Sequence, residues 1–245
     1  MIELYWAYAD YKDIAKLFER LIRHTVKEVC GTYKIPYGDN EIDFEPAFKW
    51  VTMVDSVKEA TGVDFTDLSY EDALAEAKKL HVDTSELHNR GKVIEAVWEE
   101  KVEPNLIQPT FIADHPVEIS PLAKKHKDDP RFVERFELFA GGGELGNAFS
   151  ELNDPIDQLQ RFREQGKALE AGDEEAQPLD DDFITALAYG MPPTGGLGFG
   201  IDRLVMLLTD SHSIRDVLFF PQMKEMKEGT VPVSKILAQI IDEES

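Results

Sequence analysis

The sequence predicts an α+β fold in which an antiparallel sheet is flanked by helices. Short strand-like runs are joined by glycine-rich turns, most clearly in "RFVERFELFAGGGELGNAFSEL" at residues 131–152. Amphipathic helical stretches stand outside these hairpins and do not alternate with single strands, which argues against repeated βαβ units. The chain of 245 residues with 42% hydrophobic residues is long enough to bury a substantial core.

The first fifty residues predict a strand, a helix and a hairpin. The run "MIELYWAYADY" has strand character, and because a domain rarely begins in mid-strand, we expect a truncated chain. Apolar residues then recur at helical spacing from Asp10 to Cys30, and Gly31 is placed to end that helix. The following "YKIPYGDNEIDF" predicts a hairpin around residues 38–40.

Along the rest of the chain, a group of helices is followed by a group of strands and then by two further helices. Three helical stretches, near residues 53–61, 70–80 and 91–102, predict an inserted helical subdomain. Strand character returns at 105–120 and continues through two antiparallel strands joined at Gly141–Gly143. A helix follows, with Asp154 as its N-cap and Pro155 in its first turn, and a short helix near 182–189 precedes "GMPPTGG".

Composition narrows the function classes. A net charge of −22 disfavours broad nucleic-acid binding by this chain alone and suits cationic small molecules or metal-bound nucleotides. Much of the excess lies at residues 170–182, which we interpret as a solvated helix junction. No apolar run approaches the roughly 20 residues of a membrane span, and the first thirty residues are no secretory signal. The single Cys30 fits a reducing cytoplasm.

One predicted strand face carries an unusual row of side chains. Asn147, Phe149 and Glu151 share a face because side chains alternate along a strand. An amide, an aromatic ring and a carboxylate in a row suit a long cationic ligand whose ammonium pairs with the carboxylate. Glu3 and Tyr5 repeat the pattern near the N-terminus. The alternative is that these glutamates are merely exposed.

Two carboxylates flank the glycine turn. Glu137 and Glu144 could hold a divalent cation against a triphosphate, since hard cations take oxygen ligands. Glu144 has the opposite parity to Asn147, so a bulge or a strand end is needed for both to face one site. The alternative is a chance pairing in an acidic protein.

The glycines of "GGLGFGIDRLVML" at residues 195–207 do not match a dinucleotide-binding loop, which needs the spacing G-x-G-x-x-G. Alternating glycines instead predict a strand with one bare face, over which a flat ring could lie. Arg203, in the first turn of the next helix, could then reach a phosphate. The sequence shows no zinc spacing, nucleophile elbow or P-loop lysine.

Several blocks together resemble one family. Residues 195–223, "GGLGFGIDRLVMLLTDSHSIRDVLFFPQM", are similar to motif 3 of class II aminoacyl-tRNA synthetases. "MIELYWAYADYKD", "HPVEISPLAKKHKDDPRFVERFELF" and "NAFSELNDPIDQLQRF" resemble the lysine-specific, bacterial-type members. On this resemblance we divide the chain into residues 1–52, the start of a partial catalytic core; 53–103, a helical insertion; 104–223, the core with motif 3; and 224–245, a C-terminal tail.

The resemblance implies lysine activation with ATP, giving lysyl-adenylate, followed by transfer to tRNA(Lys). Glu151 and Tyr5 would hold the side-chain ammonium, Glu3 would add negative charge, Phe149 would line the aliphatic stem and Asn147 would orient the carboxylate. Glu137 and Glu144 would hold Mg²⁺ at the ATP. Arg203 would contact the phosphates, with Gly198 and Gly200 leaving room for adenine. The family is homodimeric.

The sequence also departs from the family pattern. The anticodon-binding barrel, motif 1 and the motif 2 arginine of the family have no counterpart in this chain, since Met1 corresponds to a position just after that arginine. "AGGGELG" is richer in glycine than the usual hairpin, and Leu159 stands where an arginine is common. Two other classes stay open: a synthetase-like protein that binds lysine or a nucleotide without catalysis, and an interaction module that binds neither.

We therefore expect little or no adenylation by this chain alone. Losing one phosphate-contacting arginine costs about 3–4 kcal/mol of transition-state stabilisation, by analogy with a lost oxyanion donor. ATP–pyrophosphate exchange with lysine measures this, and robust exchange would contradict the expectation.

Overall fold

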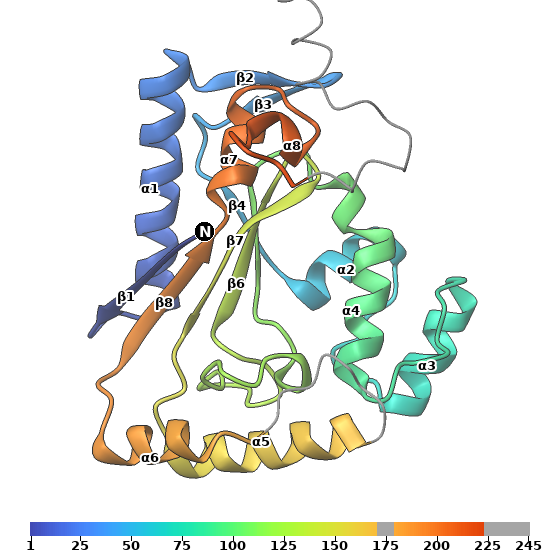
Figure 1. Cartoon of the computed structure of the whole chain (residues 1–245). Helices are drawn as coiled ribbons and strands as arrows, with labels where there is room; N and C mark the ends of the chain where they lie inside the picture. The colour runs from blue at the N-terminus through green and yellow to red at the C-terminus, as the bar shows by residue number, and fades with distance from the viewer. Residues whose placement is uncertain (171–178, 223–245) are drawn as a thin grey trace, which may run out of the picture.

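The computed structural model describes residues 1–170 and 179–222, and its centre is a six-stranded sheet in the order β1-β8-β7-β6-β5-β4 (Figure 1). The strands of this sheet are β1 (Ile2–Ala7), β4 (Lys49–Thr52), β5 (Thr110–Ala113), β6 (Arg135–Ala140), β7 (Gly143–Ser150) and β8 (Thr194–Phe199). A separate hairpin is formed by β2 (Lys34–Tyr37) and β3 (Asn40–Asp43). The expected tail at 224–245 and most of the acidic junction lie outside the described residues.

Eight α-helices surround the sheet in the described part of the chain. They are α1 (Tyr11–Cys30), α2 (Met53–Thr61), α3 (Tyr70–Lys79), α4 (Arg90–Lys101), α5 (Pro155–Glu170), α6 (Asp181–Tyr189), α7 (Ile201–Leu208) and α8 (Ile214–Val217). Short 3-10 turns lie at Glu103–Asn105 and Val117–Ile119. Figure 1 shows α1 along one side of the sheet, α2–α4 on the opposite side, and α5 and α6 at one end. The predicted α+β class is confirmed.

One strand pair differs from the expected antiparallel pattern. β4 pairs with β5 in parallel, with Lys49 opposite Thr110 and Thr52 opposite Ala113. A parallel pair needs a crossover connection, and α2–α4 provide it. The predicted antiparallel sheet is therefore confirmed except at this pair. The sequence interpretation named no strand at Lys49–Thr52, which is only four residues long and runs directly into α2.

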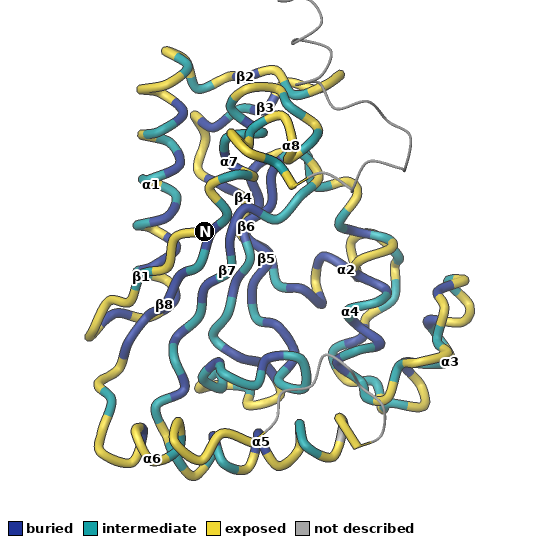
Figure 2. Tube along the Cα trace, in the orientation of Figure 1, coloured by how far each residue is buried: buried dark blue, intermediate teal, exposed yellow. Residues whose placement is uncertain are grey.

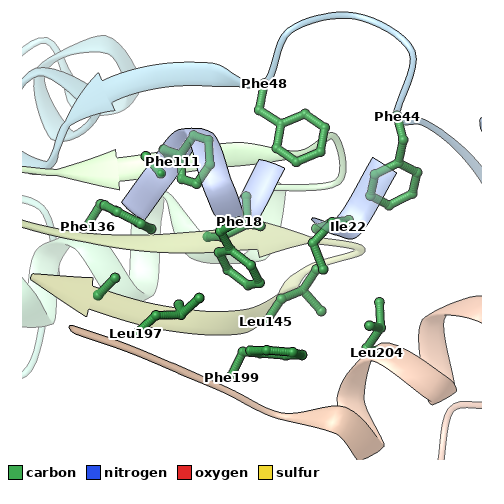
Figure 3. Close-up of a cluster of buried hydrophobic side chains, with 14 of the residues drawn as sticks. Phe18, Ile22, Phe44, Phe48, Phe111, Phe136, Leu145, Leu197, Phe199 and Leu204 are labelled. Carbon is green, nitrogen blue, oxygen red and sulfur yellow. The ribbon is translucent and has the colours of Figure 1, made fainter. Parts of the chain in front are cut away.

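Helix α1 is fixed at both ends by its sequence. The Asp10 side chain accepts hydrogen bonds from the backbone N–H groups of Lys12 and Asp13, and Gly31 ends the helix with φ 71°. The buried face of α1 packs on β7 and β8, where the Phe18 ring lies 5.3 Å from that of Phe199 (Figure 3). This packing buries the face of β7 and β8 that is turned toward α1.

The two faces of the sheet are covered differently. The face toward α1 forms one continuous core that includes Phe111, Phe136, Leu138, Ala148 and Leu197. On the opposite face, a second core contains Val51, Ile112 and Phe139 of β4, β5 and β6 packed against α2–α4. The opposite face of β7 and β1 carries intermediate and exposed residues (Figure 2), which leaves room for a site there.

The β6–β7 hairpin has the predicted glycine turn and the predicted irregularity. Gly141 and Gly142 have φ values of 65° and 78°, the positive values that a tight two-residue turn requires. The register shifts between Leu138 and Phe139, so that Glu144 pairs with Phe139 while Gly146 pairs with Leu138. Because of this bulge, Glu144 faces the same side of the sheet as Asn147 although the two residues have opposite parity in the sequence.

No helix in the two described stretches is both long enough and apolar enough to span a membrane.

The glycines of β8 allow a matched test of the two sheet faces. A Cβ atom at Gly195 would lie 2.5 Å from Ile14 Cγ1 on α1, whereas one at Gly198 would meet only Glu3 Cγ at 3.9 Å. We expect Gly195→Ala to lower the free energy of unfolding by about 1–3 kcal/mol through overpacking. Gly198→Ala should leave it unchanged or slightly raised. Urea denaturation of both variants measures the difference, and equal effects would contradict the assignment of faces.

Candidate functional site

A cavity of about 510 Å³ lies over the open half of the sheet. Strands β1, β7 and β8 form its floor, and the start of α7 forms one wall. Nine of the ten predicted site residues line it: Glu3, Tyr5, Glu144, Asn147, Phe149, Glu151, Gly198, Gly200 and Arg203. Residues up to 200 positions apart in the sequence are thus brought together, although their roles there remain predictions.

The strand register arranges these residues in two rows across the sheet. Each row runs from β1 through a glycine of β8 to β7 and on to β6. One row is Glu3, Gly198, Asn147 and Glu137; the other is Tyr5, Gly196, Phe149 and Arg135. Polar and aromatic side chains therefore stand on both sides of a central strip without side chains.

The glycine at position 196 makes room for the Glu151 carboxylate. A Cβ atom there would lie 1.9 Å from Glu151 Oε1 and 3.3 Å from a ring carbon of Tyr5. Glu151 follows β7 directly, and its backbone N–H donates to Thr194 O at 2.8 Å, which holds this position beside β8. The carboxylate is thus seated on the floor of the cavity by backbone geometry.

The end of the cavity around Glu151 favours a cation. Burial raises the pKa of Glu151 to about 7. Burial, followed by the nearby carboxylates of Glu151 and Glu3, also raises the pKa of the Tyr5 phenol, so this group stays neutral. A bound ammonium group would favour the ionised form of Glu151 and offset the cost of its burial.

Arg203 closes the other end of the cavity. Its Nη1 donates to the backbone oxygen of Glu144 at 2.9 Å and to Glu144 Oε2 at 3.0 Å. Gly200, the N-cap of α7, lies next to the Arg203 stem, and a Cβ there would lie 3.5 Å from it. The half-exposed guanidinium therefore stands beside the open floor at Gly198.

Glu137 lies next to the main cavity and not in its lining. It lines a smaller cavity of about 180 Å³, which it shares with Glu144 and Glu103. Burial, together with the charges of Glu137 and Glu144, raises the pKa of Glu103. Within residues 1–170 and 179–222, no three His, Cys, Asp or Glu side chains are grouped to hold a metal ion by themselves. Two carboxylates do suit Mg²⁺ when phosphate oxygens complete its coordination.

The sequence interpretation missed Arg135. This residue shares the strand face of Glu137, and its guanidinium donates to Glu137 Oε1 at 2.6 Å and to Asn147 Oδ1 at 3.1 Å. The signal was present in "RFELF", where Arg135 and Glu137 have the same parity.

Known proteins similar to this chain belong to one family. The sequence profile of the family described as tRNA synthetases class II (D, K and N) matches residues 1–224. The chain is 59% identical over 226 residues to a lysine–tRNA ligase of Bacillus subtilis, which covers 92% of this chain and 45% of that protein. A lysine–tRNA ligase of Halalkalibacterium halodurans is 59% identical over 225 residues, covering 91% of this chain and 45% of that protein. One of Staphylococcus saprophyticus is 58% identical over 226 residues, covering 92% and 46%.

The chain thus spans about half the length of the relatives that it matches. The family profile, over residues 1–224, covers every residue of the site described above. A family profile covering nearly the whole sequence, together with the sheet and its glycine-floored cavity, leads to one assignment. The chain belongs to the class II tRNA synthetases of the D, K and N group.

Proposed function

We propose that this chain carries the lysine- and ATP-binding centre of a lysine–tRNA ligase. The observation that carries the proposal is the partly buried Glu151 carboxylate, which lies over Gly196 beside Tyr5 at one end of the cavity. The names of the relatives support lysine as the amino acid. Residues 1–52 and 104–223 would form the core around this site, with 53–103 as a helical insertion and 224–245 as a tail.

The amino acid would lie along the row formed by β7. Its ammonium would pair with Glu151 and donate a hydrogen bond to the Tyr5 hydroxyl, and its aliphatic stem would pack on the Phe149 ring. Glu3 would add negative charge from β1. Asn147 would then meet the carboxylate, since it lies on the same strand face as Glu151 and nearer to Arg203.

The nucleotide would occupy the part of the cavity toward α7. Adenine would lie over the bare backbone at Gly198 and Gly200, and Arg203 would contact the phosphates. Glu137 and Glu144 would hold Mg²⁺, which neutralises phosphate charge when bound.

The chemistry needs positioning more than a protein nucleophile. The lysine carboxylate attacks the α-phosphate of ATP, forming lysyl-adenylate and releasing pyrophosphate. Charge stabilisation by Arg203 and a fixed approach of the two substrates would supply the catalysis that this chain contributes.

Transfer to tRNA(Lys), homodimer formation and a cytoplasmic location belong to the same proposal and rest on the relatives.

The pKa of Glu151 makes lysine binding depend on pH. The lysine ammonium stays charged below pH 9, whereas a Glu151 with a pKa of about 7 loses its charge as the pH falls. We expect the affinity for L-lysine to fall about tenfold between pH 8 and pH 6, with proton release on binding at pH 6. Titration calorimetry at the two pH values, in buffers of different ionisation enthalpy, measures both effects.

The control for this experiment is a pair of glutamate variants. Glu151→Gln should weaken lysine binding and abolish its pH dependence between 6 and 8. Glu28→Gln, on the exposed side of α1, should behave like the unaltered protein. A pH profile that survives in Glu151→Gln would show that Glu151 is not the partner of the ammonium, and absence of lysine binding at any pH would refute the proposed function.

ATP binding tests the other end of the cavity. Arg203→Lys keeps the charge but loses the planar fork, and we expect the ATP affinity to fall by about 1.5–3 kcal/mol, which is tenfold or more. Gly198→Ala should lower it as well, because the new methyl group enters the open floor. Calorimetry with ATP and Mg²⁺ measures both variants. Arg20→Lys, on the exposed face of α1, is the matched control, and an equal loss in that variant would contradict the proposal.

A further inference from the structure

One guanidinium group, that of Arg135, joins two residues of the site to the neighbouring segment at 119–120. Arg135, on β6, has a side chain only 15% exposed. Its Nε donates to Asn147 Oδ1 at 3.1 Å, and its Nη2 donates to Glu137 Oε1 at 2.6 Å. Its Nη1 donates to the backbone oxygen of Ile119 at 3.0 Å and to Ser120 Oγ at 2.9 Å.

These bonds determine how the Asn147 amide is turned. A guanidinium has only donors, so the amide atom that faces Arg135 must be the oxygen. The reversed amide would place N–H against N–H. The two Nδ2 hydrogens are therefore left as donors for the cavity that Asn147 lines. A donor pair in this position suits a carboxylate and disfavours a second cation.

The segment that accepts hydrogen bonds from Arg135 is itself bound to α5. The backbone oxygen of Ser120 accepts a hydrogen bond of 2.9 Å from Nη1 of the buried Arg161, which also pairs with Asp157 on α5. Ser120 itself is buried. The orientation of Arg135, and through it that of Asn147, is therefore set by the packing of α5 against the 119–123 segment.

We propose that Arg135 is a positioning residue that turns the Asn147 amide so that its N–H groups meet the α-carboxylate of the amino-acid substrate. This inference rests on the proposed function, because it takes lysine as the ligand. Arg135 contributes to recognition of the carboxylate end of the ligand and not to recognition of its ammonium end, which lies at Glu151.

Cadaverine, which is lysine without its carboxylate, separates the two ends. In Arg135→Met, Asn147 loses the partner that fixes its oxygen, so we expect L-lysine to bind at least tenfold more weakly while cadaverine binds within twofold of the unaltered protein. Unchanged cadaverine binding also shows that the variant is folded. Arg131→Met removes an exposed arginine four residues away, paired with Asp129 and Asp67, and should change neither ligand.

A second variant tests the amide directly. Asn147→Asp keeps an acceptor for Arg135 but replaces the N–H donors with a carboxylate oxygen. It should lose lysine binding by a similar factor, and cadaverine should bind as well as before or better. Arg135→Lys, with one compact ammonium for several acceptors, should lie between the unaltered protein and Arg135→Met for lysine.

The outcomes distinguish this inference from the function on which it rests. Equal losses for lysine and cadaverine in Arg135→Met would mean a general structural role and would overturn the inference alone. Unchanged lysine binding in that variant would overturn it too. If the unaltered protein binds neither ligand, the proposed function fails and this inference fails with it.

Discussion

The candidate site depends on one steric constraint, the absence of side chains at Gly196 and Gly198 on one face of β8. At Gly196 the space is taken by the Glu151 carboxylate, and at Gly198 it is left open as the cavity floor. The opposite face of the same strand packs Leu197 and Phe199 into the core with α1. Because side chains alternate along a strand, the five residues Gly-Leu-Gly-Phe-Gly at 196–200 give one face without side chains and one face with two large ones. The site and the core thus lie on opposite faces of β8.

The coverage of the sheet explains why the cavity lies where it does. Helices α2–α4 cover the second face only over β4, β5 and part of β6, because the parallel crossover returns the chain to β5 beside β4. In residues 1–170 and 179–222, α2–α4 do not extend over β7, β8 and β1. Polar residues can therefore stand on β7 and β1 next to a hydrophobic core without being buried by a helix, and the two strand rows converge on Gly196 and Gly198.

Much of this arrangement followed from local patterns in the sequence. The row Asn147, Phe149 and Glu151, the turn at Gly141–Gly142 and the bulge before Glu144 follow from parity and turn chemistry. The parallel pairing of β4 did not, because partner choice between distant strands leaves no trace in a four-residue run. Arg135 was also missed, since its importance comes from the partners across the hairpin and not from its own neighbours in sequence.

Arg135 and Arg203 each pair with a carboxylate of this acidic site. The chain carries a net charge of −22, and the cavity region gathers the carboxylates of Glu137, Glu144 and Glu151. Carboxylates so close together would repel one another and turn outward unless each were fixed. Arg135 fixes Glu137, Arg203 fixes Glu144, and the packing over Gly196 fixes Glu151. Glu151 has the raised pKa of a buried carboxylate, so a bound cation stabilises its ionised form. In the function that we propose, a cationic ligand is therefore attracted to the Glu151 end of the cavity, while Arg203 stands at the other end.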